Sequence, residues 1–173
     1  SLLLAGSVHA RTDVVNSDSN GLSLLNRIDY SPSLTTSGQP TEEELALIAS
    51  AGFDRVIFLA FTTHPRAVSH EDDIVRDQGL QFIHIPVEWD SPRPADFAAF
   101  AAVMQTFGSG RTLVHCEVNF RASVFAFLYQ VLFEGADVDE AMSMMQSIWV
   151  PKDTWEAFIV RVVNDKGVDY PAF

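Results

Sequence analysis

Short apolar runs that alternate with helical patterns constrain the fold of this chain more than any other feature. Three runs, 55–60, 81–87 and 112–115, are bounded by turn residues and have no polar face. That pattern is typical of strands covered on both sides. Strands that alternate with helices form a parallel sheet with helices on its faces. We therefore predict an α/β domain with a central, mostly parallel sheet of about four to five strands, flanked by helices.

Capping signals and periodicity place the helices. Thr41 and Glu44 form a capping box at the start of one helix, and Gly52 ends it. The segment 66–78 is predicted to be an exposed acidic helix. Residues 122–133 are apolar almost all round, so they are predicted to form a helix packed inside the domain. Three further helices are expected over 96–107, 137–148 and 152–165.

The N-terminal part differs from the rest in composition. Residues 11–30 are rich in Ser, Asn and Asp and are interpreted as a loose lead-in. We therefore divide the chain into a lead-in over 1–29 and a single domain over 30–173. Within the lead-in, residues 1–10 are apolar and carry Val8 and Ala10 in positions that resemble a signal-peptidase site. This pattern predicts export, for example to the periplasm; a cropped or packed segment in a cytoplasmic protein is the alternative.

Charge and cysteine usage exclude several function classes. The formal net charge of −12 argues against a nucleic-acid partner, because phosphate backbones require clustered Lys and Arg. No apolar run approaches the roughly 20 residues that span a bilayer. The single cysteine excludes an internal disulfide framework, and no Cys/His spacing predicts a metal site. Any site for an anion must therefore be local, built from a few donors in one cleft.

The one cysteine lies where a predicted strand meets a predicted helix. His115 and Cys116 follow the run 112–114, a tight loop comes next, and Arg121 opens the apolar helix. Ligands of parallel sheets bind beyond the carboxyl ends of the strands. There, loop N–H groups, a helix N-terminus and a guanidinium can all stabilise one anion and favour a thiolate nucleophile. A buried structural cysteine is the alternative.

The residues around Cys116 fit a loop that binds an anion. Asn119 tolerates the left-handed backbone that a sharp turn requires. His115 is expected to orient the loop by hydrogen bonding rather than to act as a base. The side chain of Glu117 must turn outward, because a carboxylate repels an anion. The remaining residues expected to contact the anion are Val118, Phe120 and Ala122.

A candidate general acid follows the second strand. Asp90 lies beside Trp89 in a proline-stiffened loop that reaches the same rim of the sheet. Glu88 is its rival for protonating a leaving group. Alternatively, Asp90 only caps a turn before Pro92.

Four segments together resemble the bacterial phosphatase-like family DUF442, which is similar in fold to dual-specificity phosphatases. They are Ser37–Glu44, Ala51–Ile57, His84–Val87 and Val114–Cys116. The resemblance implies a cysteine-phosphatase-like fold with no metal or organic cofactor. It also implies that Asn119 stands where the phosphatase signature has Gly. Ser123 stands where the family places a hydroxyl that supports the departing thiolate.

The spacing from cysteine to arginine departs from the phosphatase signature His-Cys-x5-Arg. Only four residues separate Cys116 from Arg121. Either the loop is one residue smaller and Arg121 points inward, or the loop keeps its full length. In the second case Ala122 occupies the usual arginine position and Arg121 reaches in from the position before it. The unchanged offset of Ser123 favours the second account.

These observations predict hydrolysis of phosphomonoesters, including phosphotyrosine, through a phosphocysteine intermediate. Cys116 would attack phosphorus, Arg121 and loop amides would bind the phosphoryl oxygens, and Asp90 would protonate the leaving group. Ser123 would assist thiolate departure. The expected partner is a phosphate-bearing small molecule or a phosphoprotein. Two alternatives stay open. The first is a rhodanese-like sulfurtransferase with a persulfide on Cys116, because rhodanese-type loops are one residue shorter than phosphatase loops. The second is an anion-binding module without catalysis.

Overall fold

The computed structural model describes residues 15–17, 22–106 and 108–167. The segment 1–10, for which export is predicted, lies outside these residues. Within the described ranges, no helix is long and apolar enough to cross a bilayer.

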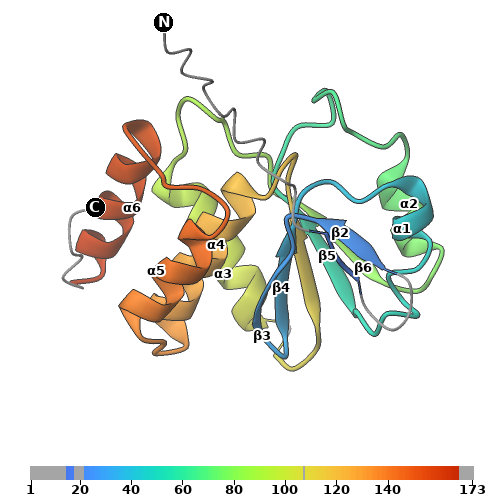
Figure 1. Cartoon of the computed structure of the whole chain (residues 1–173), viewed down its shortest axis with the longest axis horizontal. Coiled ribbons are helices and arrows are strands. Elements are labelled where there is room, and N and C mark those ends of the chain that lie inside the picture. The colour runs from blue at the N-terminus through green and yellow to red at the C-terminus, as the bar shows by residue number, and fades with distance from the viewer. Residues whose placement is uncertain (1–14, 18–21, 107, 168–173) are drawn as a thin grey trace, which may run out of the picture.

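A five-stranded sheet forms the centre of the molecule (Figure 1). Its first two strands pair antiparallel, and the other neighbours pair parallel. The α/β prediction with a mostly parallel sheet is therefore confirmed. The strands, in spatial order, are β3 (Ile28–Ser31), β4 (Leu34–Ser37), β7 (Thr112–His115), β5 (Arg55–Phe58) and β6 (Gln81–His84).

The register of the sheet brings the ends of four parallel strands to one rim. His115 at the end of β7 lies opposite Ser37 of β4 on one side and Phe58 of β5 on the other. Phe58 in turn lies opposite His84 of β6. All residues of β4, β5 and β7 are buried, because these strands have a neighbour on each edge and cover on each face. The loops that follow these strands therefore meet at the same end of the sheet.

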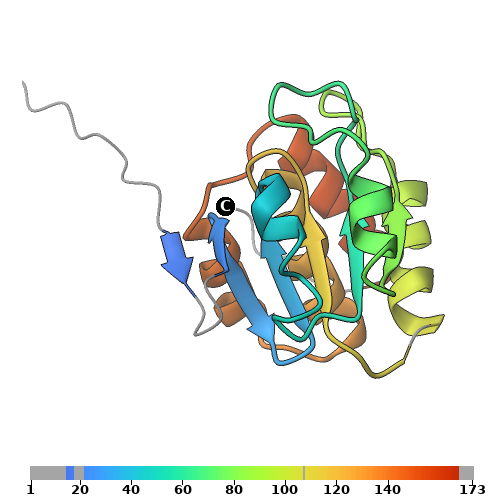
Figure 2. The same ribbon diagram turned by 90° about the vertical axis from the view of Figure 1, so that its right-hand side faces the viewer.

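Helices cover the two faces of the sheet unequally. The longer helices lie on one face and the two short helices of the described residues on the other, an arrangement visible in Figures 1 and 2. The larger layer contains α3 (Pro94–Thr106), α4 (Phe120–Phe133), α5 (Val138–Gln146) and α6 (Thr154–Asp165), and the smaller one α1 (Glu42–Leu45) and α2 (Glu71–Arg76). Since α4 packs against the sheet, α3, α5 and α6, it is apolar all round, as predicted.

The sequence-based helix limits hold except on the smaller face. The capping box of Thr41 and Glu44 is present, but α1 spans only one turn, and turns lead from it to Gly52. The exposed acidic helix predicted over 66–78 is wrong. The helix covers only residues 71–76, and Glu71 within it is buried because its carboxylate is satisfied by protein donors.

The segment expected to be a loose lead-in contributes to the fold. Residues Val15–Ser17 form β1, which pairs antiparallel with β2 (Ser23–Leu25). Leu22 and Leu24 are fully buried in a second apolar cluster, between the sheet and the short helices. The loose lead-in is therefore a wrong interpretation for residues 22–30, and the boundary predicted at residue 30 falls inside β3. The leucines alternate with polar residues, so composition alone conceals them.

Candidate active site around Cys116

Cys116 lies at the carboxyl end of β7, directly before the loop that leads into α4. Its side chain is fully buried, and its N–H donates to the carbonyl of Ser37 across the sheet (3.3 Å). The predicted setting of strand, loop and helix is therefore present. The burial of the thiol also leaves the structural alternative open.

Carbonyl groups of the loop are engaged by the N-terminal part of the chain. The Glu117 carbonyl accepts from the Gln39 N–H (3.0 Å), and the Val118 carbonyl accepts from Asn26 Nδ2 (3.1 Å). Gly38 pairs with Val118 in an isolated bridge. A Cβ at Gly38 would stand 3.1 Å from the Glu117 carbonyl oxygen, so glycine permits this close approach.

The turn at Asn119 starts α4 and leaves helical amides without intrahelical acceptors. Asn119 has φ +73°, the left-handed conformation that its sequence position predicts. Its Nδ2 donates to the Asn26 carbonyl, which holds the turn. The first helical bond runs from the Ser123 N–H to the Asn119 carbonyl (3.0 Å). The preceding N–H groups of the helix N-terminus are therefore suited to receive an anion.

Ala122 stands where the phosphatase signature has its arginine, and Arg121 stands one position before it. Ala122 is fully buried at the start of α4. Arg121 instead extends to the loop after β6, where its Nε donates to the Val87 carbonyl (2.9 Å) and its guanidinium lies 5.2 Å from the centre of the Trp89 ring. Ala122 and the left-handed turn at Asn119 agree with the account in which the loop keeps its full length, but Arg121 turns to the Val87 carbonyl instead of reaching into the loop.

A cavity of about 330 Å³ lies beside Arg121. Its lining comes from the loop after β5, the loop after β6 and the start of α4: Ala60, Phe61, Thr63, His64, Glu88 and Arg121. It combines one guanidinium with one carboxylate and one imidazole. We call it the arginine cavity.

Asp90 faces a different cavity. The tryptophan cavity, about 370 Å³, is lined by Trp89, Asp90, Trp149, Val150, Lys152, Asp153, Thr154 and Trp155. The Trp89 ring contacts both Trp149 and Trp155, and Trp155 Nε1 donates to the Trp89 carbonyl (3.0 Å). The expected acid and the expected anion-binding arginine therefore line separate cavities. Glu88, the rival acid, is the carboxylate that shares the cavity of Arg121.

Ser123 is buried below the loop, with its hydroxyl bonded on both sides. Its Oγ donates to the Phe120 carbonyl (3.0 Å) and accepts from Trp149 Nε1 (3.1 Å). The Phe120 ring stacks on Trp149 with centroids 4.6 Å apart. Trp149 therefore ties the hydroxyl and the loop residue Phe120 together. Assistance to a departing thiolate, the role predicted for Ser123, stays a prediction.

A buried chain of hydrogen bonds holds His115. Its Nε2 lies 2.6 Å from Glu71 Oε1, and the other carboxylate oxygen of Glu71 accepts from Gln39 Nε2 (2.8 Å). Gln39 Oε1 lies 3.1 Å from His64 Nε2, and His64 Nδ1 accepts from the Arg66 N–H (3.1 Å). His115 and Glu71 are 0% and 5% exposed. The chain thus connects the residue before Cys116 to the arginine cavity.

Burial and hydrogen bonding act on the pKa values of Glu71 and His64 in this series of hydrogen bonds. Burial raises the pKa of Glu71, but the charge of His115 and hydrogen bonds from His115 and Gln39 outweigh it. The pKa of Glu71 therefore lies below its ordinary value. Burial lowers the pKa of His64. These directions favour an ionised Glu71 and a neutral His64 near neutral pH.

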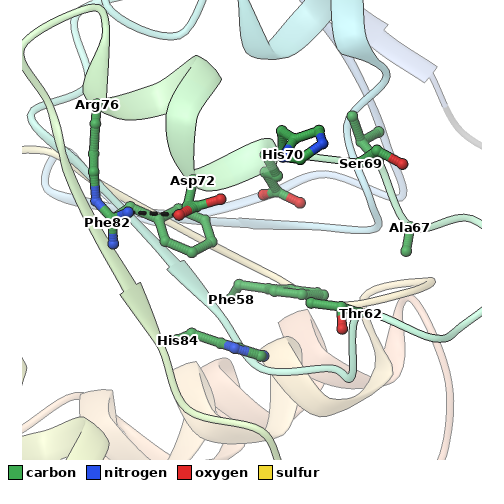
Figure 3. A pocket seen from close by; sticks show the side chains of 11 residues that line it. Phe58, Thr62, Ala67, Ser69, His70, Asp72, Arg76, Phe82 and His84 are labelled. Atoms are coloured by element: carbon green, nitrogen blue, oxygen red, sulfur yellow. Dashed lines mark hydrogen bonds and ion pairs between the residues drawn. The ribbon is translucent and has the colours of Figure 1, made fainter.

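A third cavity, about 570 Å³, lies between α2 and the ends of β5 and β6 (Figure 3). Phe58 and His84 form a flat stacked pair on one side, with ring centroids 4.8 Å apart, and Phe82 and Arg76 lie at one end. Glu71 belongs to its wall. The Phe58 ring also stacks on His115 at 4.8 Å. This cavity therefore borders the same buried chain.

Sequence reasoning missed Gln39, His64, Glu71 and Trp149 as parts of the site. Gln39 belongs to the segment Ser37–Glu44, which served only as a family marker. Glu71 stands in a run of polar residues, so its burial has no local signal. In the described part of the chain, no group of three His, Cys, Asp or Glu could hold a metal ion.

Comparison with known proteins places the fold among phosphatases. No family model matches the chain, and no curated protein matches it. A DUF442 protein from Shewanella putrefaciens CN-32, provisionally assigned as a phosphatase, is 32% identical with a TM-score of 0.74. The match covers 83% of this chain and 94% of that one.

Two more distant structures share the fold. TpbA from P. aeruginosa is 20% identical with a TM-score of 0.62, covering 83% of this chain and 85% of that one. The catalytic core of the PP-IP phosphatase SIW14 from S. cerevisiae is 11% identical with a TM-score of 0.63, covering 82% and 85%. Identity of 32% over almost the whole Shewanella protein, together with the fold around the Cys116 loop, shows that this chain belongs to the DUF442 family of phosphatase-like proteins.

Proposed function

We propose that this protein is a cysteine-dependent phosphatase that hydrolyses phosphomonoesters through a phosphocysteine intermediate on Cys116. One observation carries the proposal: Cys116 directly follows a central strand and precedes the left-handed turn of Asn119 and the N-terminus of α4. That geometry supplies free amides to an anion next to the thiol. Membership of a phosphatase-like family supports the same reaction class.

In the first step the Cys116 thiolate attacks phosphorus. A sulfur–phosphorus bond forms, the bond from phosphorus to the ester oxygen breaks, and an acid gives that oxygen a proton. Amides of the loop and of the α4 N-terminus would hold the phosphoryl oxygens. Arg121 would then contact the phosphoryl group from the arginine cavity, leaving its bond to the Val87 carbonyl.

In the second step water attacks phosphorus and the sulfur–phosphorus bond breaks. The carboxylate that donated the first proton takes one from this water, inorganic phosphate leaves and the thiolate is regenerated. Glu88 is better placed for both transfers than Asp90, because it lines the arginine cavity whereas Asp90 lines the tryptophan cavity. We therefore propose Glu88 as the acid in place of Asp90.

The charge around the site favours a substrate with one phosphoryl group. Both Arg121 and Glu88 line the arginine cavity, and the protein as a whole carries a net charge of −12. A polyphosphorylated ligand would meet few cations there and long-range repulsion. A phosphotyrosine peptide or another aryl phosphate is the first substrate class to test.

Hydrolysis of p-nitrophenyl phosphate by the wild type and by Cys116→Ser tests the mechanism. We expect the serine variant to lose at least about three orders of magnitude in kcat, since it removes the nucleophile. Rapid acid quenching followed by mass spectrometry of the peptide containing Cys116 should detect a phosphoryl adduct in the wild type. Equal turnover in both proteins would overturn the proposal.

The two acid candidates are separated by a pair of matched variants. Glu88→Gln should lower kcat for an alkyl phosphate about 100-fold or more, because an alkoxide leaving group needs a proton. The loss should be much smaller for p-nitrophenyl phosphate, whose leaving group is stable without one. Asp90→Asn should cause the smaller loss with the alkyl substrate. The reverse order would restore Asp90 as the acid.

Sulfur transfer is the second candidate function, favoured by the four-residue spacing from Cys116 to Arg121 and by Ala122 at the usual arginine position. A site without an inward guanidinium suits a persulfide better than a phosphate dianion. Thiosulfate and cyanide would then yield sulfite and thiocyanate through a Cys116 persulfide. Thiocyanate production together with inert phosphoesters would select this function, and inactivity in both assays would select the non-catalytic anion-binding module.

A further inference from the structure

We propose that Glu71 is a positioning residue for Cys116, which holds His115 as an imidazolium beside the cysteine loop and thereby favours the thiolate. The proposal deepens the proposed function, since it rests on the use of Cys116 as a thiolate nucleophile. It assigns a chemical role to a residue that local sequence places on a polar surface helix.

The pairing of Glu71 with His115 joins elements far apart in the chain. His115 ends the central strand β7, and Glu71 begins α2 on the smaller helical face. The Nε2–Oε1 distance of 2.6 Å is short for a hydrogen bond between nitrogen and oxygen, and typical of a charge-assisted one. Both side chains are almost completely removed from water.

The burial of Glu71 requires a positive partner. An ionised carboxylate loses its hydration when buried and is stable only with a counter-charge and hydrogen bonds. Gln39 gives one carboxylate oxygen a hydrogen bond but no charge. His115 gives the other oxygen a hydrogen bond and can carry the charge. The pair is therefore most stable as carboxylate and imidazolium.

His64, at the other end of this series of hydrogen bonds, favours a positive charge on His115 rather than on itself. Because Gln39 uses its Nε2 for Glu71, its Oε1 must accept a hydrogen bond from His64 Nε2. His64 Nδ1 accepts from the Arg66 N–H, so both ring nitrogens of His64 are satisfied in the neutral form. A second proton on His64 would break the bond to Arg66, and the burial of His64 opposes it as well.

Other charged and titratable groups near this pair come from the surrounding elements. They are His64 of the loop after β5, His84 of β6 beyond the Phe58 ring, Glu117 of the cysteine loop and Arg121 of α4. The positive field of Arg121 and the negative field of Glu117 oppose one another. The contact between Glu71 and His115 therefore dominates the charge of the imidazole.

The second ring nitrogen of His115 has a free bonding position. In the described part of the chain, Nδ1 is buried and has no hydrogen-bond partner. A buried polar atom without a partner lowers stability, so its presence calls for a functional explanation. In the imidazolium form Nδ1 bears a proton, and the ring carries a positive charge one residue before the thiol. The imidazolium thus favours negative charge at Cys116.

Thiolate absorbance near the far-ultraviolet edge tests this role directly, because Cys116 is the only cysteine of the chain. We expect Glu71→Gln to raise the pH midpoint of thiolate formation by about one unit. If Glu71 acted only as a nearby negative charge, its removal would lower the midpoint, since repulsion of the thiolate would disappear. A midpoint that falls or stays unchanged would overturn the proposal. The direction of this shift can be measured without any enzymatic turnover.

Two further variants isolate the route through His115. Glu117→Gln removes a carboxylate beside the loop without touching the pair, and it should lower the midpoint. In a His115→Gln background, Glu71→Gln should no longer raise the midpoint. A rise that persists without His115 would show that Glu71 acts by another route and would contradict the proposal.

The charge of His115 can also be measured without altering Glu71. Nitrogen-15 NMR of the histidine-labelled wild type, assigned with His115→Gln, should show the two imidazolium nitrogen shifts for His115 at pH 7. Neutral imidazole shifts would overturn the proposal even if the Glu71 variant failed to fold. Imidazolium shifts in a protein that hydrolyses no phosphoester would instead support the inference while removing the proposed function.

Discussion

Two unlike flanks hold the Cys116 loop. The polar flank consists of Gln39, His64, Glu71 and His115, joined by buried hydrogen bonds. The aromatic flank consists of Trp89, Phe120, Trp149 and Trp155, joined by ring contacts and by two indole N–H bonds. The polar flank can respond to pH and influence charge at the thiol. The aromatic flank sets the shape of the loops around it, and its packing does not titrate.

The difference explains how Arg121 can leave its usual position without loss of the loop. Its guanidinium lies over Trp89 and bonds to the Val87 carbonyl, so it becomes part of the aromatic side of the site. On our proposal, the polar side then supplies the charged group next to Cys116, through His115. Four predictions test this contrast, in order of the effect expected.

The largest effect should come from the aromatic flank. Trp155→Ala removes a side chain that is 2% exposed and its bond to the Trp89 carbonyl, and should lower the free energy of unfolding by about 3–5 kcal/mol. Urea denaturation measures this loss, which should be equal at pH 7 and pH 5. Val160→Ala, 36% exposed on the same helix, is the control and should change stability by less than about 0.5 kcal/mol. A pH-dependent loss in the tryptophan variant would break the contrast.

The polar flank should show the next largest effect, and this one should depend on pH. Glu71→Gln should lower the free energy of unfolding by about 3 kcal/mol at pH 7, because it removes the carboxylate partner of the buried His115. The pKa of Glu71 is lowered from 4.5 in the folded state. Its contribution is therefore fully present above that value and is lost as pH falls through the folded-state pKa.

The measurement is urea denaturation of wild type and variant at several pH values from 7 to 3. The gap between the two proteins should narrow as the solution becomes acidic. A gap that stays constant down to pH 3 would mean that Glu71 contributes through packing, like the aromatic flank. Asp29, whose pKa is also lowered, is present in both proteins and cancels in the comparison.

Gly38, at the junction of β4 with the loop, should show an intermediate effect. A Cβ there would lie 2.8 Å from Leu25 Cδ2 and 3.1 Å from the Glu117 carbonyl oxygen. Gly38→Ala should therefore lower stability by about 1–3 kcal/mol through overpacking. Leu25→Ala should relieve part of this loss in the double variant, as chemical denaturation can measure. Purely additive losses would exclude the clash with Leu25 as the cause.

The smallest effect is expected at Asn119, directly before the start of α4. Asn119→Gly relieves the left-handed strain at φ +73° but loses the bond to Asn26, so stability should stay within about 0.5 kcal/mol of wild type. Asn119→Ala keeps the strain and loses the bond, which should cost about 1–2 kcal/mol. Thermal unfolding of the two variants separates the contributions. Equal losses would show that backbone strain contributes nothing there.

Features encoded within one segment could be predicted from the sequence. The capping box at Thr41, the strand before Cys116, the buried helix after it and the left-handed turn at Asn119 all depend on neighbours in the chain. Features that depend on distant partners could not. The polar surroundings of Glu71 predict exposure, and only packing of α2 against the sheet rim brings it to His115.

The acid loop shows the same limit. The sequence around Asp90 indicates a loop after a buried strand; the loop is present after β6, but β6 is an edge strand of which no residue is buried. Which carboxylate faces Arg121 depends on how Trp89 packs against Trp149 and Trp155, residues about sixty positions later in the chain. No local pattern records that contact. The catalytic assignments of Cys116, Arg121, Ser123 and the acid remain predictions that the proposed assays address.

The sequence by itself determined the alternation of strands and helices, the single thiol at a strand end and the kinship with DUF442. Periodicity, capping and short motifs are properties of neighbouring residues, so they can be predicted from the sequence. Tertiary structure alone decided that Arg121 turns to the Val87 carbonyl, that Glu88 and Asp90 line different cavities, and that Glu71 pairs with His115. Those outcomes follow from the closure of loops across the sheet rim, where groups distant in the chain lose water together and must satisfy one another.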